Sequence, residues 1–519
     1  MWQKVKKYFF DYCEHSSIIG FNYVAERRSK GERLLWLLLV ALALALSIYF
    51  ILQMWYKYDE NPFIVSLATR VKPIFTIPFP AVTICPASKS HRSIFNYTNA
   101  VHRIWNKSDI SDYEQETVRI VSMVCKDSDV NLLLPQCEGF SETFYRRLHE
   151  IDATRGYFHE ATLCEFMGRS KNCSELFVPI ILDQGICYTF NILDREEIYK
   201  PNVYQFEHYH QHPYRNLWNQ DSGYPRNSRK DAYPRRALQA GADNSLTLLI
   251  PQLVEDADYL CQMQTGYTVT IHVPNTIPLT LKDYKIMPSD ESTTIIIEPD
   301  LLTTSATVKS YKLIDRQCYF SDEKDLAYFR MYTQENCLLE CLTNFTLKTC
   351  GCVDFFMPHE NTTEICGNSK MACLQEAQDE LKMLELDVEL DEDPENPYQS
   401  CECLPVCTQL SYKTDSFSYK WRWKEYFMAN NKLNITEKLT QSLHFSMLQV
   451  YFKSDRFLPS EKNELYGPFD FLSNFGGLLG LFTGFSLLSA VELVYFVSVR
   501  LWCNRRLYND LSGPPQRTT

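Results

Sequence analysis

The residues with the clearest chemical meaning lie near the C-terminal end, in an apolar stretch that also carries polar groups. Leu472 to Val499 is apolar enough to span a bilayer, which takes about 20 residues. The stretch nevertheless contains Asn474, Ser486, Ser489 and Glu492. Polar and charged groups at membrane depth are costly and normally face a bundle interior or a water-filled path. We therefore expect a pore-lining helix.

Glycines in the same stretch support a second interpretation. Gly476, Gly480 and Gly484 recur every fourth residue, a spacing that lets helices pack closely. A plain membrane anchor with packing glycines would explain them. The carboxylate and the serines favour the pore-lining helix over that anchor.

One other segment can span a membrane, Leu34 to Leu52, and it contains no charge. Basic residues precede this first span and follow the second, at Arg27, Arg28, Lys30, Arg33, Arg500, Arg505 and Arg506. Positive charge flanking a span marks its cytoplasmic side, so both termini are predicted in the cytoplasm. The first span also lies too far from the N-terminus to be a removable signal.

The predicted organisation follows from these two spans. It comprises a cytoplasmic segment (1–33), a first transmembrane helix (34–56), an extracellular domain (57–468), a second, pore-lining transmembrane helix (469–499) and a cytoplasmic tail (500–519). Glycosylation sequons begin only between the spans, at Asn96, Asn106, Asn172, Asn344, Asn361 and Asn434. The net charge of −12 argues against a nucleic-acid partner.

Of the 19 cysteines only Cys13 and Cys503 lie in the predicted cytoplasmic ends, which leaves 17 where an oxidising compartment would pair them. Ten of these lie between residues 318 and 407. Toward the N-terminal end of this region, neighbouring cysteines are separated by three residues and then by one. Toward the C-terminal end they are separated by one residue and then by three. This mirrored spacing suggests two antiparallel segments joined by successive disulfides. A zinc site is the competing interpretation, but C-x-C pairs are poor tetrahedral ligands. Connectivity does not follow from spacing alone.

The extracellular domain reads as mixed α and β. A helix is predicted over Ser141–Ile151, and strands over Leu246–Ile250, Tyr267–Val273, Thr293–Ile297 and Leu439–Tyr451, which are rich in β-branched and apolar residues. The acidic run at 385–395 reads as a solvated loop. The fold class is therefore an α+β membrane protein with two transmembrane helices and a large disulfide-rich extracellular domain.

Six motifs, in order and with this topology, carry a family resemblance. They are FPAVTICP (Phe79–Pro86), GICYTFN (Gly185–Asn191), RMYTQENC (Arg330–Cys337), CGCV (Cys350–Val353), CECLPVC (Cys401–Cys407) and GLFTGFSLLS (Gly480–Ser489). With them the chain resembles the degenerin/epithelial sodium channel superfamily, which includes the acid-sensing channels, and most of all its insect pickpocket subfamily.

The resemblance implies a trimeric channel with a clenched-hand ectodomain, whose thumb-like part is the disulfide-stapled region 318–407. The function it implies is a sodium-selective, amiloride-sensitive cation channel subunit of the plasma membrane. An extracellular chemical or mechanical stimulus, which the sequence does not name, would open it. The implied partners are related subunits in a homo- or heterotrimer and the lipid bilayer, with permeant Na⁺ and no cofactor or bound metal. The alternative is a non-conducting auxiliary subunit or receptor of a heteromeric sodium channel.

Site residues are carried over from the same resemblance. Gly484, Phe485 and Ser486 match the selectivity filter, and helix packing is the competing explanation for this glycine and serine. The implied pore and gate positions are Ser473, Asn474, Gly477 and Glu492. Three copies of Glu492 would form a carboxylate ring toward the cytoplasm. The N-terminal gating motif is His-Gly in the family and Ile19-Gly20 here, a departure that favours the auxiliary-subunit reading.

The resemblance also implies a disulfide pairing. It is Cys85–Cys187, Cys164–Cys173, Cys318–Cys407, Cys337–Cys403, Cys341–Cys401, Cys350–Cys373 and Cys352–Cys366. The shared pattern leaves Cys125, Cys137 and Cys261 unexplained. The simplest arrangement is a Cys125–Cys137 bridge with Cys261 free.

Three alternating histidines, His208, His210 and His212, would share one face of an extended segment and could sense pH or bind zinc. A solvated, proline-ended loop is the favoured interpretation of the same stretch. Among other classes, an ATP-gated trimeric receptor channel would lack the cysteine ladder and the Gly-Phe-Ser motif. An enzyme is not expected, since neither HExxH nor Gly-x-Ser-x-Gly occurs.

Overall fold

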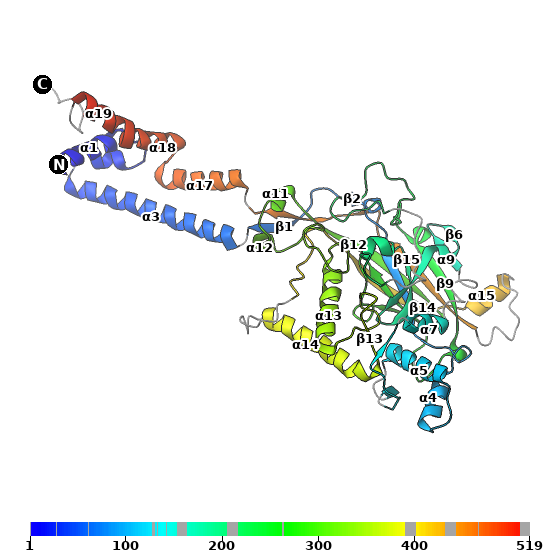
Figure 1. Cartoon of the computed structure of the whole chain (residues 1–519). Helices are drawn as coiled ribbons and strands as arrows, with labels where there is room; N and C mark the ends of the chain where they lie inside the picture. Colours follow the sequence, from blue (N-terminus) through cyan, green and yellow to red (C-terminus); the bar gives the residue numbers. More distant parts are fainter. Residues whose placement is uncertain are drawn as a thin grey trace. The chain divides into compact units, whose positions relative to one another are not determined.

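The computed structural model describes residues 2–26, 29–60, 62–126, 130–131, 133–141, 143–152, 163–204, 216–261, 264–389, 401–430, 443–465 and 467–508. The chain forms two compact units (Figure 1). The first, the terminal unit, comprises 1–66, 305–311 and 462–519; the second, the central unit, comprises 67–304 and 312–461.

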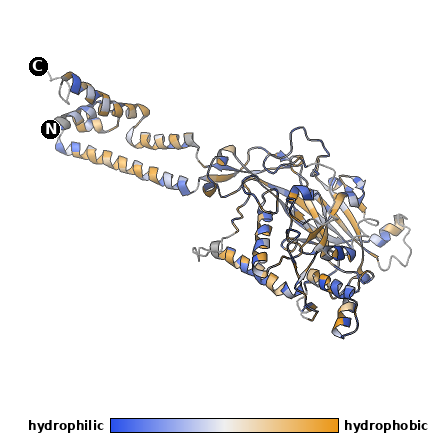
Figure 2. Ribbon diagram, viewed as in Figure 1, coloured by the Kyte–Doolittle hydropathy of each residue, from blue (hydrophilic) through white to orange (hydrophobic). Residues whose placement is uncertain are grey.

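The terminal unit is mainly helical. Its elements are α1 (Trp2–His15), α2 (Phe21–Ala25), α3 (Lys30–Glu60), α11 (Ala306–Lys309), α17 (Pro468–Thr483), α18 (Leu487–Val494), a π-helix (Tyr495–Arg500) and α19 (Leu501–Tyr508). Among the described residues, two helical stretches are long and apolar enough to cross a membrane, α3 and the continuous run Leu487–Leu507. A helix of 31 residues such as α3 is about 46 Å long. In Figure 2 most of this helix has the colour of hydrophobic residues.

The segment predicted as one transmembrane helix, 469–499, is broken in the structure. Helix α17 ends at Thr483, and α18 begins at Leu487. Gly484 has φ +67°, in the left-handed region that only glycine adopts readily, and it closes α17. Ser486 then caps α18 by accepting the N–H of Ser489 on its side chain. The local cause of the break is this glycine followed by a capping serine.

The central unit is built on two groups of strands. One is a five-stranded antiparallel sheet in the order β11 (Lys285–Met287), β10 (Tyr267–His272), β3 (Ala81–Pro86), β8 (Gly185–Phe190), β7 (Phe177–Leu182). The other runs β12 (Glu291–Thr304), β15 (Leu443–Phe452), β9 (Leu246–Leu253), β5 (Leu163–Phe166), β6 (Arg169–Lys171), with β14 (Gln409–Lys420) also on β12. Only the β12–β15 pair among these is parallel. The strands predicted near 246, 267, 293 and 439 are all present.

Alternating apolar side chains of both groups form the main core. Ile295 and Ile297 of β12 are fully buried, as are Leu248 and Ile250 of β9. The ring of Phe79, which precedes β3, contacts the rings of three phenylalanines edge-on, at centroid distances of 5.4 to 5.9 Å. Such edge-to-face contacts are favourable beyond the area they bury. The core therefore ties the FPAVTICP motif to both groups of strands.

The described chain also contains shorter elements. They are β1 (Phe63–Leu67), β2 (Lys72–Pro73), α4 (Tyr97–Trp105), α5 (Asp112–Cys125), β4 (Gly139–Phe140), α7 (Thr143–Glu150), α9 (Cys173–Leu176), α10 (Arg195–Ile198), α12 (Leu313–Arg316), β13 (Ile365–Cys366), α15 (Trp423–Asn430), β16 (Arg456–Phe457) and β17 (Ser460–Glu464). Helix α7 lies within the segment for which a helix is predicted.

The disulfide-stapled region contains α13 (Gln334–Cys350) and α14 (Met371–Glu389). Cys337 and Cys341, one turn apart on α13, bond to Cys403 and Cys401 respectively. All seven bridges implied by the family resemblance have that pairing in the structure. The expected acidic loop differs, because its first residues continue α14, in which leucine and glutamate are good helix formers.

The pairing expected for the remaining cysteines is wrong. Cys125 bonds to Cys261, with their Cα atoms 5.0 Å apart, and Cys137 is free. The N–H of Cys137 donates to the side-chain oxygen of Asn368 (2.8 Å), and β4, which follows it, pairs with β13. These contacts hold Cys137 to the chain around β13, whereas Cys125 ends helix α5. The partners are set by contacts between residues distant in the sequence.

A hydrogen-bonded carboxylate joins three segments of the central unit. Asp290, in the turn before β12, accepts the indole N–H of Trp423 (2.6 Å) and Nδ1–H of His444 (2.6 Å). Burial opposes ionisation of this carboxyl, but the two hydrogen bonds outweigh it and hold the pKa of Asp290 below its usual range. The ionised carboxylate is therefore part of the folded arrangement.

Candidate functional site

The break between α17 and α18 exposes backbone groups that neither helix uses. The N–H of Gly484 still bonds to the carbonyl of Gly480 (2.9 Å), and the ladder of α18 starts at the carbonyl of Ser486. The carbonyls of Gly484 and Phe485 thus belong to neither helix. Free backbone carbonyls at membrane depth are tolerated only where they are buried in protein or line a water-filled cavity. The three residues of the predicted filter form this break.

The N-terminal segment between α1 and α2 lies directly against the break. The N–H of Ile19 donates to the carbonyl of Thr483 (3.1 Å), the last residue of α17. A Cβ added to Gly484 would come within 2.7 Å of the Ile19 side chain. Gly20 has φ +98°, and a Cβ there would lie 2.6 Å from Val40 of α3. The structure thus brings the predicted gating motif and the predicted filter together, and both glycines are required by close approach.

Ser17, which no motif in the sequence singles out, also contacts the second span. Its hydroxyl donates to Oε2 of Glu492 (2.8 Å), its N–H contacts the same oxygen (3.2 Å), and its Oγ lies 2.7 Å from Oγ of Ser489. Glu492 is therefore hydrogen-bonded to the N-terminal segment within one chain. A carboxylate in an apolar helix needs such donors, which is the signal that could have suggested a partner near Ile19-Gly20.

A second set of contacts joins the N-terminal helix to the end of the second span. Arg500 pairs with Asp11 of α1 (2.8 Å), and the hydroxyl of Tyr8 donates to the carbonyl of Phe496 (2.5 Å). Phe496 and Arg500 lie on the π-helix, whose wider turn occurs mostly as a local bulge near functional sites. These contacts hold α1 against the second span independently of the Ile19 contact.

The residues predicted for the outer pore lie on α17. This helix packs on α3 through aromatic pairs, with Phe482 stacked on Phe50 at 5.7 Å and Phe471 edge-on to Trp55 at 5.7 Å. Ser473, Asn474 and Gly477 are exposed in the single chain. Outside its own helix and chain neighbours, no described atom lies within 4 Å of a Cβ added at Gly477. This face of α17 is therefore open for contact with other subunits.

The remaining predicted sites are surface features or fall outside the described residues. The sequon asparagines Asn96, Asn106, Asn172, Asn344 and Asn361 are all exposed, and Asn96 and Asn172 cap short helices. Asn434 and the three histidines His208, His210 and His212 lie outside the described residues. Within the described parts of the chain, no group of three or more His, Cys, Asp or Glu side chains could hold a metal ion.

Comparison with known proteins gives a consistent result along the chain. The family described as "amiloride-sensitive sodium channel" matches residues 12–496. Pickpocket protein 28 of Drosophila melanogaster is 28% identical over 97% of this chain and 80% of its own length. Pickpocket protein 11 of the same organism is 26% identical over 96% and 78%. The human bile acid-sensitive ion channel is 22% identical over 95% and 86%.

Proposed function

The chain belongs to the amiloride-sensitive sodium channel family, and we propose that it is a subunit of a sodium-selective, amiloride-sensitive channel of the plasma membrane. Family and relatives are ion channels, so the chain is a cation channel subunit of the degenerin/epithelial sodium channel type and not an enzyme. Family members assemble from several subunits. Beyond this family membership, the proposal specifies Na⁺ as the permeant ion, amiloride as a blocker, a trimeric assembly of identical or related subunits, and both termini in the cytoplasm.

The observation that carries the proposal is the broken helix at Gly484-Phe485-Ser486. In a trimer, three breaks facing a common axis would present a ring of carbonyl oxygens, which can replace the water around a small cation. Serine and glycine have small side chains, so the three backbones can approach the axis closely and the ring of carbonyl oxygens stays narrow. Glu492, two turns further on, would attract cations to the cytoplasmic end. We propose Na⁺ as the permeant ion and an extracellular stimulus as the trigger.

One observation favours a second function, a non-conducting auxiliary subunit. Ile19 replaces the motif histidine, and its side chain occupies the space in front of Gly484. An apolar group there neither binds a cation nor titrates. A subunit of this kind would modify the current carried by partner subunits and would not conduct alone.

Current recording from cells expressing the chain alone, or together with related subunits, tests both functions. The channel proposal expects an amiloride-sensitive current that falls when K⁺ replaces Na⁺. Ser486→Leu is expected to lower the Na⁺-to-K⁺ permeability ratio or abolish the current, whereas the matched Ser498→Leu, on the π-helix, is expected to keep the ratio. A normal ratio in Ser486→Leu would remove this residue from the filter. Current only on co-expression would support the auxiliary role.

A further inference from the structure

The polar contacts around the break form a continuous chain of hydrogen bonds. Oγ of Ser489 lies 3.1 Å from the backbone nitrogen of Ser486 and 2.7 Å from Oγ of Ser17. Oγ of Ser17 in turn lies 2.8 Å from Oε2 of Glu492. Ser489 is only 1% exposed, so its hydroxyl is shielded from competing water within the single chain. These contacts connect the backbone of the predicted filter to the carboxylate.

The direction of each hydrogen bond follows from the number of hydrogens that each group carries. A serine hydroxyl has one hydrogen and two lone pairs, whereas an ionised carboxylate only accepts. The hydrogen of Ser17 therefore goes to Glu492. The two serine oxygens at 2.7 Å then need the hydrogen of Ser489 between them. Ser489 is left with its lone pairs, and one of them accepts the N–H of Ser486.

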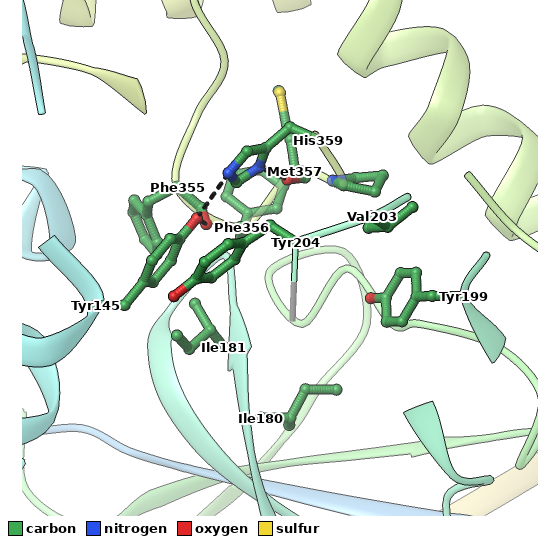
Figure 3. A pocket seen from close by; sticks show the side chains of 11 residues that line it. Tyr145, Ile180, Ile181, Tyr199, Val203, Tyr204, Phe355, Phe356, Met357 and His359 are labelled. Atoms are coloured by element: carbon green, nitrogen blue, oxygen red, sulfur yellow. Dashed lines mark hydrogen bonds between the residues drawn. The ribbon is translucent and has the colours of Figure 1, made fainter. Parts of the chain in front are cut away.

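A tyrosine in the central unit shows the distance that results when a hydroxyl hydrogen is already used. The hydroxyl of Tyr145 donates to the carbonyl of Phe355 at 2.8 Å. Nδ1–H of His359 donates to the carbonyl of Met357, and because burial lowers the pKa of His359, its ring is neutral and Nε2 is an acceptor. The tyrosine oxygen and this nitrogen lie 3.5 Å apart (Figure 3). The 2.7 Å between the two serines is, by contrast, the distance of a hydrogen bond.

The bond from Ser486 to Ser489 also fixes the carbonyl of the preceding residue. The carbonyl of Phe485 and the N–H of Ser486 belong to one planar trans peptide group, so they point in opposite directions. Because the N–H is held toward Ser489, the carbonyl of Phe485 points away from it. The carbonyl oxygen lies 3.6 Å from a Cβ added to Gly480. It is therefore beside a residue that has no side chain to cover it.

We propose that Ser489 is a positioning residue of the filter, which sets the direction of the Phe485 carbonyl by holding the N–H of Ser486. Ser17 supports this role, because it takes the hydrogen of Ser489 and leaves the lone pairs of that oxygen to the N–H. The inference rests on the proposed channel function, in which the carbonyl meets the permeant cation. Ser489 acts through the peptide group and not by contact with the ion. Without its hydroxyl, the peptide group is free to rotate.

The permeability ratio distinguishes this role from a purely structural one. A serine that only caps α18 would affect helix stability and leave the ratio unchanged. Ser489→Ala removes only the hydroxyl, and alanine is a good helix former. At matched surface level, its Na⁺-to-K⁺ permeability ratio is expected to fall about two- to tenfold, the range of one hydrogen bond. The matched control is Ser498→Ala, whose hydroxyl bonds to the carbonyl of Val494 in the same helical run and which is expected to keep the ratio.

Replacing the amide between Phe485 and Ser486 by an ester isolates the hydrogen bond itself. The ester is introduced with the α-hydroxy acid analogue of serine at position 486, and it lacks the N–H that Ser489 accepts. This change is expected to lower the permeability ratio. Adding Ser489→Ala to the ester is then expected to change the ratio less than about twofold, because the bond is already absent. A full additional loss would show that the hydroxyl acts elsewhere.

Hydrogen exchange of the Ser486 amide separates this inference from the proposed channel function, because it needs no current. In the full chain in lipid nanodiscs, Ser489→Ala is expected to raise the exchange rate about two- to tenfold, and Ser498→Ala to leave it unchanged. Faster exchange without Na⁺ current from any variant would support the positioning and contradict the channel function. The inference is overturned by equal exchange in wild type and Ser489→Ala, by an unchanged permeability ratio in a conducting Ser489→Ala, or by additive losses with the ester.

Discussion

Replacing Gly484 with alanine is the most direct test of the contact between the N-terminal segment and the broken helix. A left-handed backbone at φ +67° costs a non-glycine residue roughly 1–2 kcal/mol. The new methyl group would also lie 2.7 Å from the side chain of Ile19, and overpacking of this kind costs about 1–3 kcal/mol. Together these terms disfavour the present arrangement by about 2–5 kcal/mol per subunit. We expect the N-terminal segment to leave the break.

Cross-linking measures that displacement without relying on current. The hydroxyl oxygens of Ser17 and Ser489 lie 2.7 Å apart, so cysteines at both positions are expected to form a disulfide when an oxidant is added. Gly484→Ala is expected to reduce this cross-link strongly. In current recordings the same variant is expected to change the Na⁺-to-K⁺ permeability ratio, because the carbonyls of the break shift.

The chain offers a matched control and a rescue. Gly476→Ala, on the same span, places its methyl group at least 4 Å from every described atom outside its own helix and neighbours, and alanine favours a helix by roughly 0.5–1 kcal/mol. It is expected to leave cross-linking and permeability unchanged. Adding Ile19→Ala to Gly484→Ala removes the overpacking between these two side chains but keeps the backbone cost at position 484. This double variant is therefore expected to recover part of the cross-link. Wild-type cross-linking and permeability in Gly484→Ala would refute the reasoning.

Three more predictions concern other parts of the molecule. Cys341→Ser and Cys401→Ser are each expected to cost about 2–5 kcal/mol and to lower surface expression, and the double variant to be little worse, since the two share one bridge; additive losses would contradict this. Ser473→Phe, on the open face of α17, is expected to overpack a closed trimer by about 1–3 kcal/mol per subunit. The variant is then expected to carry a standing amiloride-sensitive current, whereas Ser473→Ala is expected to stay silent. If both variants reach the surface normally and are equally silent, this position does not form a gate. Asp290→Asn is expected to lower the melting temperature near neutral pH. Because its pKa is lower in the folded state, the carboxyl stabilises above its unfolded pKa of about 4 and loses that effect as pH falls through the folded value, so the two melting curves are expected to converge in acid.

The N-terminal contacts have a mechanical consequence for the proposed channel. Ile19 contacts the break, Ser17 binds Glu492, and Asp11 pairs with Arg500. Any movement of the second span at the break must therefore move the N-terminal segment or break these contacts. The hydrogen bonds from Ser17 to the Glu492 carboxylate are the costly ones to lose, because hydrogen bonds to a charged group contribute about 1.5–3 kcal/mol.

Several features follow from the sequence because they depend on local composition. An uncharged run such as 34–52 has no stable place in water, so its helix and its membrane role follow from hydropathy alone. The segments 246–250 and 293–297 are rich in β-branched and apolar residues, which favours strands. The break at Gly484 has a local cause, a glycine followed by a capping serine, but from the sequence we predict one continuous helix over 469–499. The cysteine spacings between 318 and 407 matched a family pattern, and the pairing came with it.

Other features were decided only by the tertiary structure. Cys125 bonds to Cys261 because the contacts around β13 hold Cys137 elsewhere, and spacing carries no information on that. Ser17 meets Glu492 across 475 residues of sequence. Contacts of this kind depend on how whole elements pack. Local propensity does not specify packing, because many arrangements bury the same apolar surface and only the complete chain selects among them.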